Sequence, residues 1–278
     1  MRNFNRFAVT MLVCTLGSAP AFAQDEPVGF NGFYVSGAVG ITMQGGNDGD
    51  SVVFDTNRDG SFNENVVTTL GANAFTPGFC AGSSTSATPG SCREDRKRID
   101  YGVRLGLDSR IGESLVVGAL VEVSKNDSVD GTTAFSTTPA GYSFERQLDY
   151  AISGRARIGF TPGGRALIYG TGGVSYARID HKFFTTNTVN SFTATNDRDW
   201  VWGYQLGGGG EFMLTDNISI GAEYLYNRYD DDKYFVAIGP GTAAATNPFL
   251  LNGGGTNFRP SRSNFDFHTV RATLSFHF

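Results

Sequence analysis

The segment from His268 to Phe278 alternates strictly between apolar and polar side chains. Its apolar positions are Val270, Ala272, Leu274, Phe276 and Phe278, and its polar positions are Thr269, Arg271, Thr273, Ser275 and His277. Alternation with a period of two predicts a β-strand with one apolar face. Because this face ends on an aromatic side chain, the segment is typical of a lipid-facing strand that ends at the bilayer surface. It therefore predicts the closing strand of a transmembrane β-barrel.

The first residues carry the three parts of a secretory signal peptide. Arg2 and Arg6 make a positively charged start, residues 7–16 form a short apolar core, and Ala21-Phe22-Ala23 offers a small-x-small cleavage site. We expect residues 1–23 to be removed before Gln24, together with Cys14. Elsewhere the sequence contains no run of the roughly 18 apolar residues that a transmembrane helix needs.

Eight segments of the mature chain show period-two alternation between turn residues. They are Gly32–Gln44, Arg98–Asp108, Glu113–Lys125, Glu145–Phe160, Arg165–Ile179, Arg198–Met213, Asn217–Tyr229 and Phe265–Phe278. Tight turns connect three pairs of them, at Ser109–Gly112, Thr161–Gly164 and Leu214–Asp216. Long polar connections join the others, at residues 45–97, 126–144, 180–199 and 230–264. Short turns on one side and long loops on the other are typical of an outer-membrane barrel.

These patterns predict an all-β fold, an eight-stranded antiparallel up-and-down transmembrane β-barrel formed by residues 24–278. An even number of strands places both chain ends on the short-turn side, toward the periplasm, and the four long loops outside the cell. The loops are rich in Gly, Ser, Thr, Asn and Asp, so we expect them to lack the apolar content for a core of their own. The alternative is a ten-stranded barrel that uses parts of Ser51–Leu70.

Charged residues are sorted onto one side of the predicted strands. The expected lipid face of seven strands carries no Asp, Glu, Lys or Arg over its central span, and an arginine that faces hydrocarbon costs roughly 2–4 kcal/mol. The opposite face carries Asp100, Arg104, Glu122, Asp149, Arg155, Arg157, Glu211, Glu223 and Arg271. In the fifth segment, Arg165–Ile179, the two phases compete, because Leu167 and Tyr169 fit one face while Ile168, Val174 and Tyr176 fit the other.

The interior of an eight-stranded barrel has little room beyond its own side chains. We therefore expect a plug of ion pairs formed by Arg104, Glu122, Arg155, Arg157, Glu211, Glu223 and Arg271. The alternative for these residues is a narrow or gated ion path.

Aromatic residues gather toward both ends of the strands and predict two interfacial belts. Trp200, Trp202, Tyr204, Tyr224, Tyr226 and Tyr150 lie toward the long loops, and Phe160, Phe212 and Phe278 toward the short turns.

The first long loop contains a candidate calcium site. The run Asp55-Thr56-Asn57-Arg58-Asp59-Gly60 matches the opening of a calcium-binding loop, in which alternate oxygen ligands converge on one hard cation. The twelfth position is Val66, where an EF-hand needs a bidentate Glu, and Glu64 stands two residues early. We therefore keep Asp55, Asn57, Asp59 and Glu64 as candidate ligands of a loop-stapling calcium ion, against the alternative of an Asx turn.

Two cysteines remain after cleavage, Cys80 and Cys92. An even pair in an exported chain predicts a disulfide, which typically contributes about 3 kcal/mol, and the alternative is two free thiols.

Loss of Arg2 and Arg6 with the leader changes the formal net charge from −5 to −7. An acidic chain argues against a nucleic-acid partner, which requires a basic patch.

Catalysis would need a nucleophile beside a base, as in enzymes that hydrolyse or transfer lipid acyl chains. The three histidines are His181, His268 and His277. His277 shares a predicted face with Ser275 at the periplasmic end, and His268 lies near the outer rim. Neither forms a recognisable nucleophile–base pair in the sequence, so we expect no enzymatic activity.

Several segments, in this order, resemble the opacity-type, porin-family outer-membrane β-barrel proteins, which are relatives of the OmpA membrane domain. The segments are Gly32–Val35, Leu167–Tyr176, Gly203–Phe212, Ala222–Tyr226 and His268–Phe278. The resemblance covers the barrel but not the long loops. It implies that the outer-membrane assembly machinery inserts the barrel after reading its terminal strand, with Phe276 and Phe278 as the signal. The long first loop with its two cysteines departs from the family pattern.

We expect a non-catalytic integral protein of the cell outer membrane, with a structural role in the envelope and loops presented to the outside. A loop-based adhesin or receptor, and a narrow small-solute channel, are the alternatives. The expected partners are outer-membrane lipid, lipopolysaccharide and the assembly machinery. No surface ligand is indicated, and calcium in the first loop is the one candidate cofactor.

Overall fold

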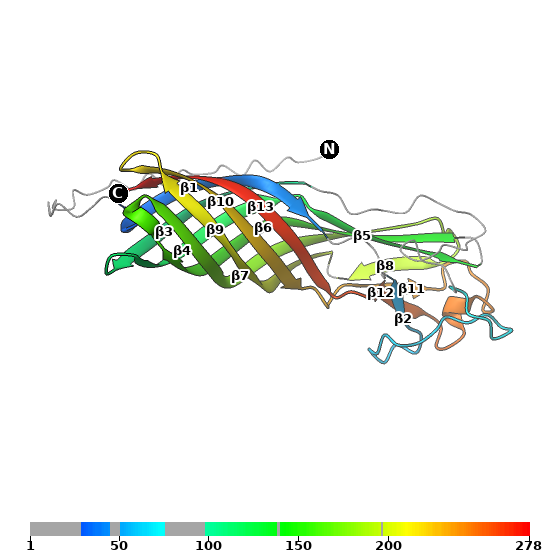
Figure 1. The fold of residues 1–278 in the computed structure, drawn as a ribbon. Helices are drawn as coiled ribbons and strands as arrows, with labels where there is room; N and C mark the ends of the chain where they lie inside the picture. The colour runs from blue at the N-terminus through cyan, green and yellow to red at the C-terminus, as the bar shows by residue number, and fades with distance from the viewer. Residues whose placement is uncertain (1–28, 45–50, 76–97, 138–139, 196) are drawn as a thin grey trace, which may run out of the picture.

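Eight strands close into one antiparallel barrel in the computed structural model, which describes residues 29–44, 51–75, 98–137, 140–195 and 197–278 (Figure 1). The barrel strands are β1 (Gly32–Met43), β3 (Ile99–Ile111), β4 (Leu115–Asn126), β6 (Ala140–Phe160), β7 (Ala166–Thr185), β9 (Arg198–Met213), β10 (Ile218–Asp230) and β13 (Asn264–His277). Each pairs with the next in this order, and β13 pairs with β1. The predicted eight-stranded up-and-down barrel is confirmed, and residues 51–70 add no strand to it.

Side chains of the barrel strands alternate between the outer wall and the interior, as the period-two pattern predicts. Every strand presents exposed apolar residues on the outer wall, among them Phe33, Leu105, Val121, Ile158, Ile168, Leu206, Ile220 and Leu274. Strand pairing aligns these residues across the wall, since Val35 lies opposite Leu105 on β3 and opposite Phe276 on β13. The outer wall is therefore a continuous apolar surface.

The phase of β6 differs from the prediction near its middle. Its sequence pattern predicts Leu148 on the lipid face, which is wrong, because Leu148 is buried inside. The pairing of β6 with β7 shifts register between Leu148 and Ala151, and a bulge of this kind reverses the facing of the residues beyond it. Asp149, expected inside, instead lies at the rim, where its carboxylate is 3.3 Å from the Lys125 ammonium.

The two faces of β7, which alternation leaves unassigned, are distinct in the structure. Ile168 and Val174 lie on the outer wall, whereas Leu167 and Tyr169 are buried inside. The hydroxyl of Tyr169 donates a hydrogen bond to Glu223 at 3.0 Å. A buried tyrosine needs such a partner for its hydroxyl group, and only the interior supplies one.

Tight turns connect the strands at the end of the barrel where the C-terminus lies (Figure 1). Gly112 (φ 65°) lies between β3 and β4, and the helical turn η1 (Pro162–Gly164) connects β6 to β7 with Gly164 at φ 76°. Glycine adopts these left-handed conformations without the clash of a Cβ atom. The short connections of the sequence thus become the short-turn end of the barrel.

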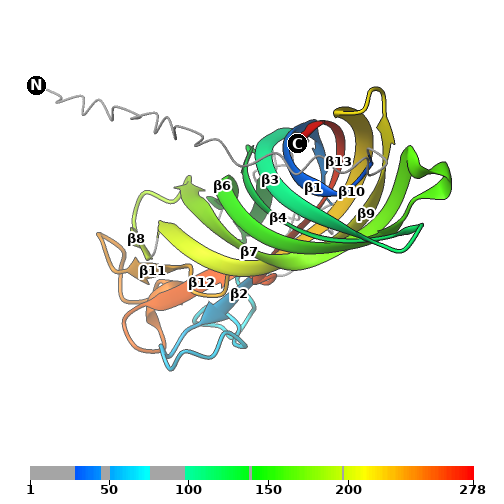
Figure 2. The ribbon, with the colours of Figure 1, turned by 90° about the vertical axis from the view of Figure 1, so that its left-hand side faces the viewer.

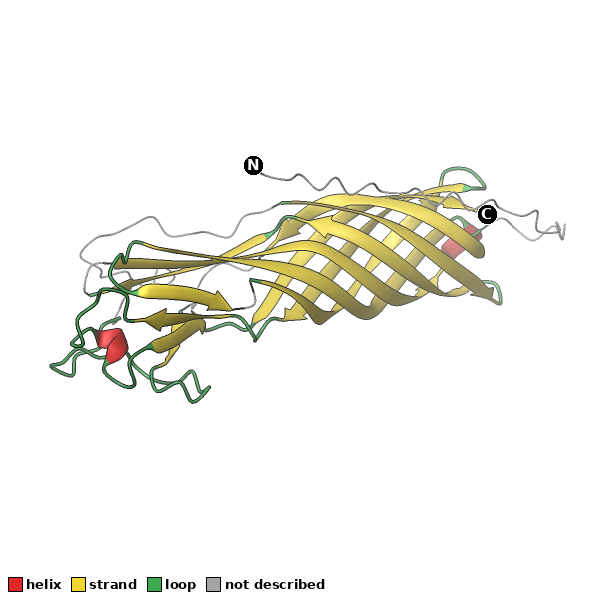
Figure 3. Ribbon diagram, turned by 180° about the vertical axis from the view of Figure 1, so that it is seen from behind, coloured by secondary structure: helices red, strands yellow, loops and turns green. Residues whose placement is uncertain are grey.

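At the opposite end the chain forms a second layer of strands that we call the cap, made of residues 51–75, 127–137, 140–147, 180–195, 197 and 231–263. In it, β5 (Val129–Ser136) pairs with the start of β6, which extends beyond the barrel with β7 (Figure 3). A separate sheet orders β2 (Val52–Asp55), β12 (Thr256–Pro260), β11 (Phe235–Gly239) and β8 (Ser191–Thr195) beside this extension (Figure 2). The cap also holds the helical turn η2 (Pro248–Leu250).

Neither helical turn of the described residues is long and apolar enough to span a membrane.

An aromatic core packs the two sheets of the cap together, so the expectation that the long loops lack a core is wrong. Phe258 of β12 is fully buried, and its ring centroid lies 4.8 Å from that of Phe144 and 5.3 Å from that of Phe183. Other members are Phe54, Phe75, Tyr142, Phe192 and Phe249. Each long connection contributes only a few of these residues, and for this reason no single loop has an apolar composition.

Candidate functional site

Charged side chains from five strands meet in the middle of the barrel. Three arginines face three carboxylates there, Arg104, Arg155 and Arg271 against Glu122, Glu223 and Asp100. All six side chains are buried. We call this set the central network. Equal numbers of opposite charges offset the loss of hydration that burial imposes.

Glu122 holds the central network together. Its Oε2 lies 2.9 Å from Arg104 Nε and 2.9 Å from Arg155 Nη2, and its Oε1 pairs with the guanidinium group of Arg271. Glu223 bridges two of the same arginines, with Oε1 2.9 Å from Arg104 Nη2 and 3.2 Å from Arg155 Nη1. Hydrogen bonds between ionised groups are about twice as strong as neutral ones. One carboxylate in β4 thus fixes side chains from β3, β6 and β13.

A second group lies nearer the short turns and centres on Arg157. Its Nη1 donates to Glu211 Oε1 at 2.7 Å, and its Nε donates to Asp108 Oδ1 at 2.7 Å. The guanidinium group also lies over two rings, 4.5 Å from the centroid of Tyr34 and 5.2 Å from that of Tyr169. The plane of a guanidinium group is suited to such stacking.

All seven residues of the predicted ion-pair plug lie in these two groups. Sequence reasoning missed Asp108, Tyr34 and Tyr169. The phase of β3 could have found Asp108, because it shares a face with Asp100 and Arg104. The alternation of β1 likewise places Tyr34 on the interior face, because its neighbours Phe33 and Val35 face outward. Tyr169 has no comparable signal, since it lies on the strand whose phase the sequence leaves open.

Apolar side chains fill the barrel above and below the charges. Toward the cap lies a layer of Leu148, Ala151, Ala177, Ile179, Val201, Tyr229, Phe265 and Phe267. Toward the short turns lies a layer of Phe30, Val116, Leu167, Tyr169 and Met213. The charged networks thus lie between two clusters of buried apolar side chains, and buried polar groups such as Asn227 and Ser219 lie at the same levels.

The short-turn end contains a serine beside a histidine. Ser219 Oγ lies 3.0 Å from His277 Nε2 and donates to Glu211 Oε2 at 3.1 Å. Ser219 and His277 are 0% and 4% exposed, and the ring of His277 packs edge-on against Phe30. Both side chains are therefore closed off from solvent at this contact. His268 lies elsewhere, on the outer wall, with Nδ1 2.6 Å from the hydroxyl of Tyr224.

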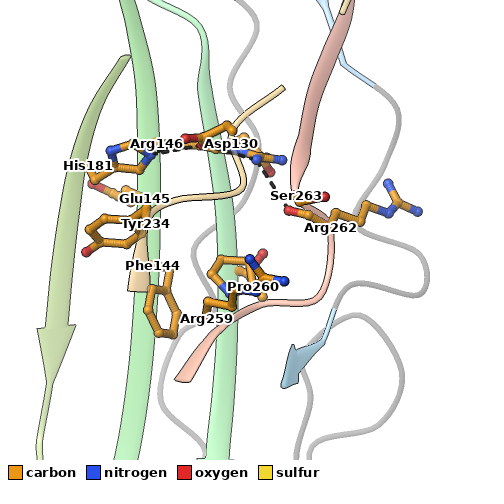
Figure 4. Close-up of a pocket in the computed structure, with 12 residues that line it drawn as sticks. Asp130, Phe144, Glu145, Arg146, His181, Tyr234, Arg259, Pro260, Arg262 and Ser263 are labelled. Atoms are coloured by element: carbon orange, nitrogen blue, oxygen red, sulfur yellow. Dashed lines mark hydrogen bonds and ion pairs between the residues drawn. The ribbon is translucent and has the colours of Figure 1, made fainter. Parts of the chain in front are cut away.

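A small pocket lies between the barrel mouth and the cap, and Arg146 of β6 forms part of its wall (Figure 4). The Nε of Arg146 lies 2.5 Å from Asp130 Oδ2, and its Nη1 lies 3.4 Å from Asp231 Oδ2. It also donates to the carbonyl oxygens of Arg262 (3.3 Å) and Asn264 (2.6 Å). One side chain therefore ties β6 to β5 and to the segments on either side of the cap sheet.

His181 of β7 extends this cluster along the wall of the pocket. Its Nε2 lies 2.9 Å from Asp231 Oδ2, and its ring stacks on Tyr234 with 4.1 Å between the centroids. Figure 4 shows the two rings one above the other. The pair of His181 and Asp231 is buried, like Arg146, so the cluster holds the cap on the barrel through charge and stacking.

The stability of this junction is expected to depend on pH through Asp231. Burial raises the pKa of Asp231, but the hydrogen bond with His181 and the charge of Arg146 outweigh burial and hold the pKa below its ordinary value of 3.8. A carboxyl group of this kind stabilises the fold above its ordinary pKa, and the contribution disappears as the pH falls through the folded value.

We expect Asp231→Asn to lower the resistance of the cap to urea at pH 7, and the difference from the unmodified protein to shrink below pH 4. Limited proteolysis in a urea series at several pH values measures this difference in urea resistance. A difference of the same size at pH 3 would refute the linkage.

The candidate calcium ligands form a turn in the cap. The carboxylate of Asp55 accepts a hydrogen bond from the amide of Asp59 at 3.0 Å, and Asn57 Nδ2 donates to Asp59 Oδ2 at 3.1 Å. Glu64 Oε2 accepts hydrogen bonds from the amide (2.5 Å) and hydroxyl (2.8 Å) of Thr56. Within the part of the chain that the structure describes, no three acidic, cysteine or histidine side chains gather as a metal site. Calcium binding here stays a prediction.

The remaining predicted features lie at the chain end or outside the described residues. Phe276 and Phe278 are exposed on the outer wall, with their rings 5.0 Å apart. The signal peptide of residues 1–23 and the cysteines Cys80 and Cys92 lie outside the described residues, so the disulfide stays a prediction.

A closed eight-stranded barrel with an apolar outer wall and a packed, charged interior defines an integral β-barrel membrane protein. The family model described as "outer membrane protein beta-barrel domain" matches residues 9–278. The chain belongs to this family, and its location is the outer membrane.

The chain is similar to the 31 kDa outer-membrane immunogenic protein of Brucella melitensis biotype 1, with 25% identity over 183 residues. This match covers 64% of the chain and 65% of the relative, so the chain spans less than two thirds of the relative's length. Among solved structures it resembles the outer membrane protein OprG from Pseudomonas aeruginosa, with 12% identity, a TM-score of 0.46 and coverage of 91% and 100% of the two chains. It also resembles the outer membrane protease OmpT from Escherichia coli, with 10% identity, a TM-score of 0.39 and coverage of 90% and 97%.

Proposed function

We propose that this protein is a non-conducting barrel that anchors a folded cap at the cell surface and serves a structural role in the envelope. The observation that carries the proposal is the filled lumen. Paired, buried charges occupy the middle of the barrel, and apolar layers lie on both sides of them. Opening an ion path would separate buried ion pairs, and removing one partner of such a pair costs about 3–5 kcal/mol.

The proposal places the cap outside the cell and the short turns in the periplasm. Two features support this orientation. The connections are sorted by length between the two ends of the barrel, as in outer-membrane barrels generally. The C-terminal residues Phe276 and Phe278 lie on the outer wall at the short-turn end, where the assembly machinery could read them from the periplasm.

Planar-bilayer recording tests the closed lumen. The purified protein is expected to give no stable open steps under an applied voltage at neutral pH, because paired charges and buried apolar side chains fill the lumen. A general porin inserted into the same lipid provides the positive control. Steady stepwise currents that scale with salt concentration would reject the structural proposal and favour the narrow small-solute channel.

A second function is favoured by the cap itself. Its aromatic core gives the long connections a fixed shape, whereas a purely structural barrel needs only short ones. A rigid surface at the cell exterior suits an adhesin or receptor. We propose no catalytic role, because the Ser219–His277 contact is closed off from solvent.

A further inference from the structure

An arginine pair lies on the outer wall at the cap end of the barrel. In the pairing of β7 with β9, Arg178 lies opposite Trp200, and Asp180 lies opposite Arg198. Alternation turns these side chains outward, since the intervening Ala177 and Ile179 of β7 are buried in the interior. The pair therefore faces the surroundings of the barrel and not its lumen.

Aromatic rings next to this pair mark the level of the membrane interface. The ring of Tyr176 lies 5.0 Å from that of Trp200 at an angle of 20°, and 4.7 Å from that of Trp202. Nearer the barrel centre, the outward residues on the same strands are the apolar Val174 and Leu206. Tryptophan and tyrosine gather where hydrocarbon meets headgroups. On its own strand each arginine lies one step beyond a ring, Arg178 beyond Tyr176 and Arg198 beyond Trp200, toward the level of the headgroups.

The two arginines share a single carboxylate. Asp180 Oδ1 lies 3.7 Å from Arg178 Nε and 3.4 Å from Arg198 Nε. No other described residue forms an ion pair or hydrogen bond with either guanidinium group. The side chains are 32% and 69% exposed. Asp197 and Asp199 flank Arg198 in the chain, but alternation turns Asp199 toward the interior and Asp197 lies near Tyr234 of the cap. On the outer face two positive charges therefore face one negative charge, an excess that suits a phosphate group.

The neighbouring sector of the rim, formed by β4 and β6, lacks this excess of positive charge. There Lys125 lies 3.3 Å from Asp149 and 3.9 Å from Asp127, so one positive charge faces two negative ones. An anionic headgroup would be repelled from Lys125 and attracted to the arginine pair. Of these two sectors, charge complementarity favours the one formed by β7 and β9.

We propose that Arg178 and Arg198 bind a phosphate group of a phosphorylated glycolipid of the outer leaflet, the chemical class to which the lipopolysaccharide anchor belongs. The guanidinium groups donate hydrogen bonds to the phosphate oxygens. The sugar lies against the rings of Trp200 and Trp202, and the acyl chains follow the apolar wall below them. This assignment requires the cap end to face the outer leaflet but does not depend on whether the lumen conducts.

The test measures binding of diphosphorylated lipid A to the full protein in detergent micelles by native mass spectrometry. Each charged residue near an anionic lipid surface typically changes affinity by about fivefold. The double variant Arg178→Gln/Arg198→Gln is therefore expected to bind about 30-fold more weakly. Asp180→Asn is expected to bind more tightly, because it removes the competing carboxylate.

The matched control is Arg165→Gln. Arg165 is also an exposed arginine beside a single carboxylate, Asp216 at 3.3 Å, but it lies at the short-turn end. It should bind lipid A like the unmodified protein. Equal binding by the double variant and the unmodified protein, both with native sheet content by circular dichroism, would overturn the proposal, and so would an equal loss in Arg165→Gln.

Two further measurements identify the source of the phosphate. Dephosphorylated lipid A is expected to bind the double variant and the unmodified protein equally. Millimolar inorganic phosphate without lipid is expected not to raise the unfolding temperature. An arginine-dependent stabilisation by inorganic phosphate alone would assign the site to a soluble anion and reject the glycolipid.

Discussion

Glu122→Gln is expected to lower the free energy of unfolding of the barrel by about 3–5 kcal/mol, the usual effect of removing one partner of a buried ion pair. Glutamine has nearly the same shape as glutamate, so the change removes charge and not volume. It leaves three buried guanidinium groups facing two carboxylates, Glu223 and Asp100. The amide nitrogen would also point a donor at groups that only donate.

Urea unfolding of the purified protein in micelles, followed by tryptophan fluorescence, measures this effect. Glu113→Gln is the control, because Glu113 is exposed in the turn before β4 and should change stability by less than about 0.5 kcal/mol. If Glu122→Gln proved as mild as the control, the central network would not be what fills and holds the lumen. The structural proposal would then lose its main support.

Phe258→Ala is expected to destabilise the cap by about 3–5 kcal/mol while the barrel stays folded. The ring of Phe258 is fully buried and lies near rings from all four long connections, so its removal leaves a cavity between the two cap sheets. The charged networks of the barrel make no contact with this ring. The loss should therefore be confined to the cap.

Limited proteolysis of cells that display the protein separates the two regions. Phe258→Ala should open the cap to cleavage and leave a barrel fragment of native mobility, whereas Leu70→Ala, at a position 94% exposed, should behave like the unmodified protein. Cleavage of the barrel strands in Phe258→Ala would contradict the independence of the two cores. The same cells distinguish the two proposed functions. If the cells lose their binding to external surfaces when the cap is opened, the result supports an adhesin. If their binding is unchanged, the result supports the structural role.

The barrel could be predicted from the sequence because a bilayer imposes a local rule on each strand. A residue such as Val121 or Leu274 must be apolar if it faces hydrocarbon, and its neighbours in the chain must then face inward. Alternation with a period of two therefore identifies a strand, its lipid-facing side and its inward-facing charges without knowledge of the strands that pair with it. The rule failed at Leu148, because a bulge in the pairing with β7 shifts the phase and leaves no mark in the composition.

The cap could not be predicted, because its order comes from contacts between distant parts of the chain. Asp55 of β2 pairs with Asn257 of β12, and Phe54 lies opposite Phe258 in the same ladder. Neither segment alone buries enough apolar surface to fold, so each resembles a polar loop when it is considered separately. Their combination supplies a core that neither composition reveals.

The sequence by itself determined the eight barrel strands, the side of seven of them that meets lipid over most of their length, and all but one of the charges assigned to the interior, since the solvent around each residue controls these choices. Only the tertiary structure decided that Glu122 would join three arginines, that Asp108 and two tyrosines would surround Arg157, and that four polar connections would share one aromatic core. Those outcomes depend on distances between residues far apart in the chain, which local patterns do not encode.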